Sequence, residues 1–585
     1  MAQVVYQYGG PPIAFGAIDA DEVGTFPVYE GVDSANLGAH EGQAMLLVAT
    51  PFVSTATVET PGPMPFGTID DILANNFHVP GALTTIYPAA THGDSSSPSD
   101  TPANTYIPSK FTGEIQYQQA LFGGANPLAK GSASFGELVL LDPDGELDTL
   151  LDYGWDGISM ELRRGAPGAA FSTYTTIAYF TSASGLVGDL FEKRIRLRNL
   201  GWILEAAELH GNRYLGTGGI EGSSTLTGRL KPYTAGYVFN ITPVLINTTS
   251  LVFQASYTSI RSVQEVRDGG AALSFAANYS TYDALVAATV SAGQYATCLA
   301  YGLIRVGSAP VYGITMDLCG DNDTYNSVTG PTTRGAIVRR IATGIGSLRL
   351  LDSTQVDYTS FVQFESKQPA EVGFYWDGSN AITKAAALDE IMAGCVGFWF
   401  VRPNGQLSIG QVEDPASYSP TLTLGYPSTS NDGESRLGEP VILDVIPPRR
   451  ATYIGYKRNY TQQGQSDLAG TVTQANALIY SQETRYSGQG SLWLANSYQT
   501  APAVFVQGNY RNESDASAEA QRQQTLFSVM RRRYSIPIVM DPLADVVAQK
   551  AQINYFNRMG WGSSKNLLVC GIQTAGSSVE LHFWG

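Results

Sequence analysis

The clearest hydrophobic pattern in the chain lies in residues 379–412 and predicts a helix followed by a tight hairpin. Apolar side chains recur there at the i, i+3, i+4 and i+7 spacing of one buried helical face. We expect Ser379 or Asn380 to cap the helix and Gly394 to end it. The four apolar positions of the face are Leu388, Ile391, Met392 and Cys395.

The hairpin is predicted by its turn residues and by the alternation that follows them. Pro403 suits the first central position of a type I turn, and Gly405 suits the left-handed residue that closes it. Leu407 and Ile409 then alternate with polar Gln406 and Ser408, as in a strand with one face in water. The unit has no nucleophile, base or cluster of metal ligands, so it suggests a structural element.

Short strand-like runs separated by turns dominate the rest of the chain. They predict a mainly β fold with a few helices (α+β), arranged as several small barrel or sandwich domains. The expected strands are 43–49, 52–60, 111–121, 136–141, 158–163, 174–181, 193–200, 236–247, 251–257, 297–306, 311–318, 441–445, 451–460, 566–572 and 578–583.

Four further segments favour helices. Residues 147–153 and 281–290 predict short helical segments, and residues 514–533 predict the longest helix, capped by Ser514 or Asp515. We also expect Thr332 or Thr333 to cap a helix whose inward residues are Ala336, Ile337 and Ile341.

Length and composition set the scale of this organisation. A chain of 585 residues requires roughly three to five domains. Hydrophobic residues make up 43%, enough for sizeable cores, whereas charged residues make up only 15% against an ordinary ~25%. We expect domains at 1–105 (loop-rich β region), 106–215 (first β-barrel-like domain), 216–330 (second such domain), 331–415 (helix plus hairpin) and 416–585 (β with one long helix).

The charge balance argues against nucleic-acid recognition. The net charge is −17, and the densest basic cluster is Arg531–Arg533 at the end of the predicted long helix. There we expect the three cations to complement the negative helix end rather than bind phosphates. An acidic surface suits a channel past which DNA slides without sticking.

Cysteine usage and hydropathy indicate a reducing compartment and no membrane span. Cys298, Cys319, Cys395 and Cys570 are widely separated and predict buried free thiols rather than a disulfide framework. Residues 1–6 lack the basic and apolar regions of a signal peptide, and no run approaches the ~20 apolar residues of a transmembrane helix.

A search for catalytic motifs names no catalytic, cofactor-binding or metal-binding residue. The five histidines lack metal-ligand spacing, and H-E-x-x-H, G-x-S-x-G and P-loop motifs are absent from the sequence. The glycine-rich residues 216–222 do not match a dinucleotide fingerprint and are interpreted as a hinge. We therefore expect a protein that is not an enzyme and needs no cofactor.

Two alternatives to that expectation depend on particular residues. Asp142, Asp144, Glu146 and Asp148, with Asp152 and Asp156 beyond, have alternating carboxylates that can chelate calcium, although a solvated hairpin turn is favoured. A glycosidase would need two facing carboxylates, and nothing in the sequence selects a pair. Tyr453, Tyr456 and Tyr460 could bind sugars, although tyrosine is also an ordinary strand former.

Several ordered motifs resemble the central tail-hub proteins of long-tailed bacteriophages and gene transfer agents. Residues 228–247 read GRLKPYTAGYVFNITPVLIN and resemble the G-x-x-K-P…G…N…P-V-L-I signature of that family. Five further parts resemble it in the same order, whereas residues 1–105 carry no match. These parts are residues 136–165, residues 263–273 with Asp268-Gly269-Gly270, residues 295–321, and the helix and hairpin followed by the ending VELHFWG.

The resemblance implies a structural virion protein at the tail tip or baseplate. Such hubs are homotrimers whose two barrels per subunit join a six-fold tail tube to a three-fold tip. The implied partners are a distal tail or tail-tube protein, tape-measure protein, tail fibre or central spike proteins and the host cell surface. Viral DNA would pass through without specific binding. Assembly would occur in the host cytoplasm.

The resemblance also gives the hairpin an expected role. Phe398, Trp399 and Phe400 can each contribute ~1.5–3 kcal/mol by burial, with one face on the preceding helix and the other on a neighbouring domain or subunit. Two other function classes stay open: a tail-associated enzyme that degrades carbohydrate or peptidoglycan, and a receptor-binding tail protein that uses loops 91–103 and 428–433.

Overall fold

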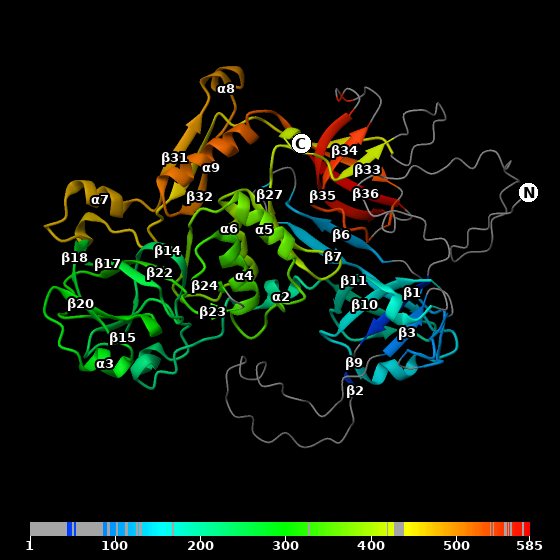
Figure 1. The fold of residues 1–585 in the computed structure, drawn as a ribbon, viewed down its shortest axis with the longest axis horizontal. Coiled ribbons are helices and arrows are strands. Elements are labelled where there is room, and N and C mark those ends of the chain that lie inside the picture. Colours follow the sequence, from blue (N-terminus) through cyan, green and yellow to red (C-terminus); the bar gives the residue numbers. More distant parts are fainter. Residues whose placement is uncertain are drawn as a thin grey trace, which may run out of the picture.

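The computed structural model describes residues 44–49, 52–53, 86–90, 94–100, 103–111, 115–123, 127, 131–166, 169–325, 328–417, 419–425, 438–538, 540–541, 543–554, 559, 561, 564–575 and 578–585. Strands dominate these residues and form several separate sheets, which confirms the mainly β, multi-domain fold class. In Figure 1, sheet-rich parts lie on either side of a central group of helices.

A seven-stranded sheet contains most of the described N-terminal strands. Its order is β12-β13-β11-β10-β1-β3, with β8 paired to β13. Nearby lie the 3-10 helices η1 (Asp148–Asp152) and η2 (Phe171–Thr173). The strands are β1 (Ala44–Ala49), β3 (Ile86–Ala90), β8 (Glu137–Leu141), β10 (Ser159–Gly165), β11 (Thr175–Ser182), β12 (Val187–Gly188) and β13 (Glu192–Arg198).

Two five-stranded sheets share the segment after the glycine-rich joint. One has the order β18-β17-β22-β14-β25 and the other β15-β16-β21-β20-β19. Short helices η3 (Gly219–Glu221), η4 (Ser224–Leu226), α3 (Tyr282–Ala287) and η5 (Leu299–Tyr301) lie between the strands. The strands are β14 (Tyr233–Ile241), β15 (Val244–Asn247), β16 (Val252–Gln254), β17 (Ser262–Asp268), β18 (Ala271–Ala272), β19 (Ser274–Asn278), β20 (Gln294–Cys298), β21 (Leu303–Val306), β22 (Ile314–Gly320) and β25 (Gly373–Trp376).

An eight-stranded sheet contains the end of the chain and also strands from its first quarter. Its order is β28-β34-β35-β36-β33-β29, and β6 pairs with β35 and β7. Strands 117–135 therefore share a sheet with strands 422–584, while the proposed domain limits stay predictions. The strands are β6 (Tyr117–Ala120), β7 (Ser132–Phe135), β28 (Leu422–Gly425), β29 (Val441–Ile446), β33 (Arg531–Ile538), β34 (Lys550–Asn554), β35 (Ser564–Ala575) and β36 (Ser578–Trp584).

A separate arm projects from this arrangement at the upper left of Figure 1. Its three-stranded sheet has the order β31-β30-β32 and packs against the long helix α9 (Glu513–Leu526). The other elements of the arm are β30 (Ala451–Tyr456), η7 (Gln465–Asp467), α7 (Gln474–Ser481), β31 (Arg485–Gly490), α8 (Leu492–Ser497) and β32 (Ala503–Tyr510).

Helices and one hairpin fill the centre of the molecule. These are α2 (Trp202–Ala206), α4 (Arg334–Gly344), α5 (Tyr358–Lys367), α6 (Lys384–Ala393), β26 (Gly397–Val401) and β27 (Leu407–Gln411), followed by η6 (Pro415–Ser417). Three small strand pairs complete the described elements: β2 (Phe52–Val53) with β9 (Tyr153–Gly154), β4 (Asp94–Ser95) with β5 (Tyr106–Ile107), and β23 (Thr324–Tyr325) with β24 (Val328–Thr329).

The predicted helix and hairpin are present, with a different helix start. Helix α6 begins at Lys384 because Thr383, rather than Ser379 or Asn380, accepts a hydrogen bond from the amide of Ala386 (3.2 Å). The helix ends at Gly394, as expected. Gly405 has φ +82°, the left-handed conformation that the turn requires.

One detail of the hairpin prediction is wrong. Ser408 is only 1% exposed rather than in water. Its hydroxyl lies 2.6 Å from a carboxylate oxygen of Asp357, which also accepts a hydrogen bond from Arg402 (3.0 Å). The alternation of the strand survives, but its polar face meets polar side chains of α5 and its cap instead of solvent.

The hairpin forms the wall between two hydrophobic cores. Phe398 and Phe400 pack with the seven- and eight-stranded sheets, whereas Leu407 and Ile409 pack with the buried faces of α4 and α6. Trp399 also contacts this second core. One face of the hairpin thus packs on the preceding helix, as expected, whereas the contact of the other face with a neighbouring domain or subunit stays a prediction.

The predicted long helix is shorter than its pattern suggested. Helix α9 ends at Leu526, and the chain turns back so that Arg531–Arg533 opens strand β33. The interpretation of this triplet as the end of a helix is wrong as stated. One contact of that kind does exist, because Arg531 Nε donates to the carbonyl of Leu526 (2.9 Å).

Candidate functional site

The acidic residues 142–148 lie against two lysines. Lys110 Nζ is 3.2 Å from Asp142 Oδ1 and 3.1 Å from Glu146 Oε2, and it also contacts Asp144. Asp142 is fully buried. Burial acts to lower the pKa of Lys110, but the hydrogen bonds to these carboxylates outweigh it and leave the pKa raised. The ammonium group therefore stays charged beside them.

Strand pairing supplies the second lysine. Because β13 pairs antiparallel with β8, Lys193 stands opposite Leu140, just before the acidic turn. Its Nζ lies 2.9 Å from Asp148 Oδ1 and 3.5 Å from Asp142 Oδ2, and the hydrogen bond to Asp148 raises the pKa of Lys193. The two ammonium groups thus occupy the place beside the carboxylates where the calcium alternative would put a cation.

The remaining acidic residues of that alternative lie apart from the turn. Asp156 is paired with Arg198 at 3.7 Å. The side chain of Asp152 lies outside the described part of the structure. Over the described residues, no group of three or more His, Cys, Asp and Glu side chains is arranged to hold a metal ion.

The three tyrosines singled out for sugar binding do not form one surface. Tyr460 stacks edge-on against Tyr375 (5.3 Å), whose amide donates to the Tyr460 hydroxyl (3.2 Å). Tyr456 faces Glu513 at the start of α9, and burial, together with that contact, raises the pKa of Tyr456. Tyr453 alone points toward the open face of the arm sheet, where it contacts Phe505.

The four cysteines are buried free thiols, as predicted. Burial raises the pKa of Cys570 to about 12 and the pKa of Cys319 and of Cys395 to about 11. Because the thiolate is the reactive form, these groups are chemically quiet near neutral pH.

His210 lies in an aromatic enclosure that the sequence did not suggest. Its ring is 4.3 Å from that of Tyr257 and 5.3 Å from that of Trp376. The amide of Asn212 donates to its Nδ1 (3.2 Å). Burial lowers the pKa of His210 to about 3, so the ring is neutral in the folded protein at physiological pH.

The glycine-rich residues 216–222 form a compact loop. The amide of Gly216 donates to the carbonyl of Glu221 (2.9 Å), and Gly218 donates to Gly222 (2.8 Å). The Glu221 carboxylate pairs with Lys231 (2.7 Å), a residue of the 228–247 motif. Whether the loop acts as a hinge stays a prediction.

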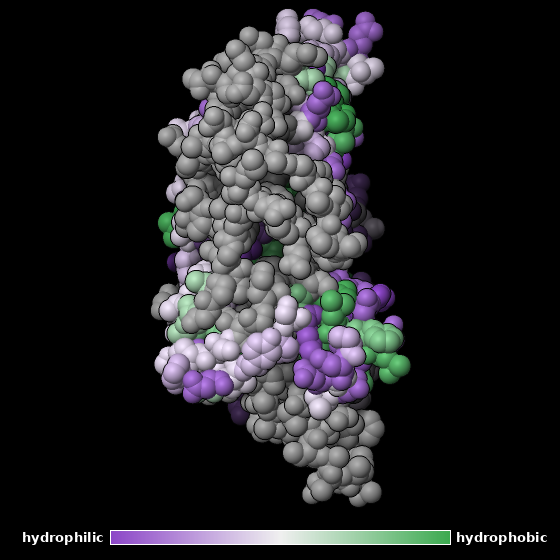
Figure 2. All heavy atoms as spheres, turned by 90° about the vertical axis from the view of Figure 1, so that its right-hand side faces the viewer, coloured by the Kyte–Doolittle hydropathy of each residue, from purple (hydrophilic) through white to green (hydrophobic). Residues whose placement is uncertain are grey.

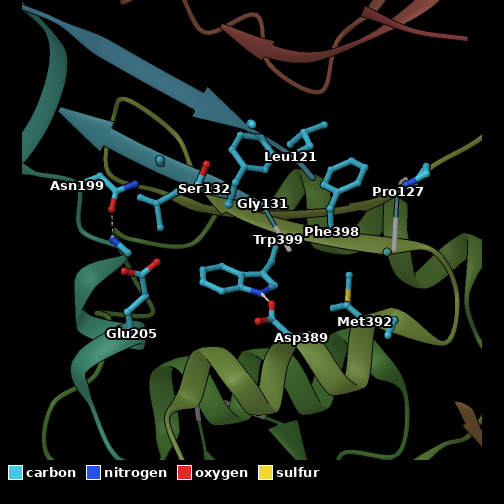
Figure 3. A pocket seen from close by; sticks show the side chains of 17 residues that line it. Leu121, Pro127, Gly131, Ser132, Asn199, Glu205, Asp389, Met392, Phe398 and Trp399 are labelled. Carbon is cyan, nitrogen blue, oxygen red and sulfur yellow. Dashed lines mark hydrogen bonds between the residues drawn. The ribbon is translucent and has the colours of Figure 1, made fainter. Parts of the chain in front are cut away.

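A cavity of about 120 Å³ lies where the hairpin meets α2, α6, β6 and β7. Figure 3 shows Leu121 and Phe398 above it and Glu205 and Asp389 below, with Trp399 between them. Trp399 Nε1 donates to Asp389 Oδ1 (2.7 Å). The cavity has room for several water molecules. Sequence reasoning could not find it, because its walls come from segments far apart in the chain.

Strand β29 is an edge strand with unusual side chains. It pairs with β33 on one side, and it is the last strand of the eight-stranded sheet in that direction. Four of its apolar residues are at least 38% exposed: Val441, Ile442, Leu443 and Val445. Exposed apolar edge strands invite pairing with another strand, so this edge is a candidate protein contact.

The tip of the arm is a second exposed apolar surface. Leu492 and Trp493 in α8 are 85% and 67% exposed, and α8 lies at the outer end of the arm in Figure 1. On the face shown in Figure 2, the coloured hydrophobic residues instead appear as small groups among hydrophilic ones. The exposed apolar side chains of β29 and α8 make both of them candidate contact surfaces.

Comparisons with known proteins found similarity only among solved structures. No family model matches the chain, and no curated protein matches it in sequence. The chain is similar to the tail protein from Neisseria meningitidis MC58 (TM-score 0.32, 9% identity, covering 81% of this chain and 94% of that one). It is also similar to the 43 kDa tail protein of prophage MuSo2 from Shewanella oneidensis (TM-score 0.29, 9% identity, 80% and 92%).

A third similar structure is a chain of the virion of a native gene transfer agent particle (TM-score 0.34, 11% identity, covering 61% of this chain and 84% of that one). TM-scores of this size do not establish a shared overall fold. No helix among the described residues combines the length and the apolar character needed to span a membrane.

Proposed function

We propose that the chain is a structural protein of a phage-type tail and forms the central hub of the tail tip or baseplate. The observation that carries the proposal is the order and placement of the motifs resembling tail hubs. Residues 228–247 form β14 and β15, and residues 263–273 form β17 and β18. Residues 295–321 supply β22, which pairs with both β14 and β17. These three motifs thus share the two five-stranded sheets, whereas residues 136–165 and the ending VELHFWG lie in the seven- and eight-stranded sheets.

One largely buried ion pair and a backbone hydrogen bond join the three strands β14, β17 and β22. Arg267 on β17 donates to Asp317 on β22 through Nη1 (2.9 Å), and the amide of Asn240 on β14 donates to the same carboxylate oxygen (2.8 Å). Arg267 is 3% exposed, and its hydrogen bonds to Asp317 outweigh burial and keep its pKa raised. A rigid unit of this kind suits a protein whose task is to hold an assembly in register.

The exposed apolar surfaces support a role inside a larger particle. The β29 edge and the α8 tip leave large hydrophobic side chains in water, where burial against a partner stabilises an assembly by roughly 25 cal/mol per Å². We propose a homotrimer that binds a distal tail or tail-tube protein on one side and fibre or spike proteins on the other. Tape-measure protein and DNA would pass through its channel, and the net charge of −17 suits a lumen that does not bind DNA.

The test is the mass of the purified protein, followed by its position in the particle. Native mass spectrometry should give three times the monomer mass of 62.6 kDa. Cryo-electron microscopy of the virion should then place the chain at the tail tip, on the three-fold axis. A monomer that lies elsewhere in the particle, or one that cleaves host polysaccharide or peptidoglycan, would contradict the proposal.

The receptor-binding alternative depended on loops 91–103 and 428–433. Residues 428–433, 91–93 and 101–102 lie outside the described residues. In the described part of the first loop, β4 pairs with β5 and the carboxylate of Asp100 accepts the amide of Ser97 (2.7 Å). This alternative stays a hypothesis, tested by adsorption of particles that lack either loop.

A further inference from the structure

The outer face of the arm sheet presents three aromatic rings in mutual contact. The rings of Tyr453 on β30 and Phe505 on β32 are stacked, with centroids 4.5 Å apart and an interplanar angle of 8°. Tyr486 on β31 meets Phe505 edge-on at 5.2 Å. Phe505 and Tyr486 are 60% and 40% exposed. Three strands thus contribute to one ring cluster that is open to solvent.

Strand pairing explains why the rings gather there. Tyr453 stands opposite Phe505 on the parallel side of β30 and opposite Gly488 on the antiparallel side. A methyl group added at Gly488 would collide with the Tyr453 ring. Glycine at this position therefore lets the tyrosine lie across its neighbouring strand, a known way of covering a glycine in a sheet.

The opposite face of the same sheet is buried in the hydrophobic core. Thr452 and Ile454 are 0% exposed, and Val506 is 5% exposed. Ile454 and Val506 pack with Ala516 and Ala520 of α9. Helix α9 therefore packs on the face opposite to the ring cluster. The rings are exposed even though this helix is in place on the sheet.

The rings stand on uncharged segments, with an ion pair between Glu483 and Arg458 (3.2 Å) at the rim of the sheet. No charged residue occurs between Arg485 and Arg511, and β30 carries none. Two positions beyond Phe505, Gln507 Nε2 donates to Glu483 Oε1 (2.6 Å) at the exposed rim of the sheet. The polar groups near the exposed rings are thus the Gln507 amide, which belongs to the neutral segment, and the Glu483 carboxylate, which also pairs with Arg458.

We propose that this face, consisting of Tyr453, Phe505, Tyr486 and the flanking Gln507, is a binding site for a neutral saccharide. A pyranose ring has one or both faces lined by C–H groups, which pack on an aromatic face, while its hydroxyls bond amides and carboxylates. Both kinds of group are present here, on a rigid sheet. The site is independent of the hub assignment and adds carbohydrate contact to whatever place the chain takes in a particle.

The same observations disfavour single-stranded nucleic acid. Bases also stack on exposed aromatic rings, but such sites combine the rings with a basic groove that follows the phosphates. Here the segment that carries two of the rings has no lysine or arginine within it, and the chain as a whole is acidic. A second copy of the chain could also cover these exposed rings. The experiment below distinguishes self-association from saccharide binding.

Binding is measured by isothermal titration of the full chain with neutral hexasaccharides of glucose, galactose, mannose and N-acetylglucosamine. We expect at least one to bind, and Phe505→Ala and Tyr453→Ala each to weaken that binding about tenfold or more. Raising the salt concentration should leave the affinity nearly unchanged, because the saccharide carries no charge. The matched control is Phe275→Ala, which removes a phenylalanine of similar exposure (56%) from β19.

Two further measurements keep the proposal decisive. Thermal unfolding of each variant checks that the arm still folds, and Gln507→Ala tests the polar rim without removing a ring. If none of the hexasaccharides binds, the proposal is wrong. It is also wrong if Phe505→Ala and Tyr453→Ala abolish self-association in sedimentation experiments while leaving saccharide binding intact, because the face is then a contact between copies.

Discussion

The indole of Trp399 on β26 donates a hydrogen bond of 2.7 Å to the carboxylate of Asp389 on α6. The two residues are ten positions apart, and the bond joins the hairpin to the helix that precedes it. It also forms part of the wall of the cavity in Figure 3. The helix and hairpin predicted most clearly from the sequence are thus joined by a side-chain hydrogen bond of their own.

Trp399→Phe should lower the free energy of unfolding by about 1 kcal/mol, because it removes the hydrogen bond and keeps an aromatic ring. Chemical denaturation of both proteins measures the difference. Trp493→Phe is the matched control, since Trp493 is 67% exposed at the arm tip and should change stability little. Equal effects from the two substitutions would show that the Asp389 contact contributes nothing.

Phe400→Ala should destabilise the protein by roughly 3–5 kcal/mol, because Phe400 is 5% exposed on the hairpin face that packs with the two large sheets. Because the hairpin lies between two cores, the loss of stability should affect the C-terminal sheet. Calorimetry should show it as a lower melting temperature of the unfolding transition that includes this sheet. Phe191→Ala, at a position 64% exposed, should leave that transition in place. An unchanged transition in Phe400→Ala would show that packing of the hairpin does not stabilise the C-terminal sheet.

Asp142→Asn should lower stability by more than the ~0.5 kcal/mol typical of surface substitutions, because it leaves Lys110 and Lys193 without their shared buried carboxylate. Asp144→Asn, at a side chain 51% exposed, should be nearly neutral. Adding calcium or a chelator should not shift the melting temperature of the wild-type protein. A clear calcium-dependent rise would restore the metal-site interpretation of residues 142–148.

His210 should make stability fall as the pH is lowered below 6.5. Its pKa is about 3 when folded and near 6.5 when unfolded, so between these values the unfolded chain binds the extra proton. The contribution is present in full above pH 6.5 and decreases by about 2–3 kcal/mol by pH 4.5. Chemical denaturation at several pH values gives the free energy of unfolding as a function of pH. This free energy should change less with pH in His210→Phe, which keeps a ring beside Tyr257. Identical slopes in the two proteins would contradict this account.

Ile442→Lys with Val445→Lys should prevent assembly while leaving the isolated chain folded. Both side chains on edge strand β29 are exposed, so the change should cost the monomer little. Native mass spectrometry and incorporation into particles measure the outcome. Val187→Lys on β12, 54% exposed, is the control, and assembly by the β29 variant would remove this edge from the proposed contacts.

The sequence alone predicted those features that depend on residues close together in the chain. The face of α6, the end of this helix at Gly394 and the left-handed Gly405 follow from periodicity and turn chemistry. The mainly β class follows in the same way from the many short strand-like runs separated by turns. The buried thiols were predicted from their wide spacing.

Only the tertiary structure decided which distant residues meet. It brings Lys110 and Lys193 to the acidic turn, ends α9 before Arg531, and adds β6 and β7 to the C-terminal sheet. It also places Tyr453 beside Phe505 while Tyr460 packs elsewhere. Local patterns fix backbone conformation through hydrogen bonds between near neighbours, whereas these contacts depend on the path of the whole chain and on which apolar faces it buries together.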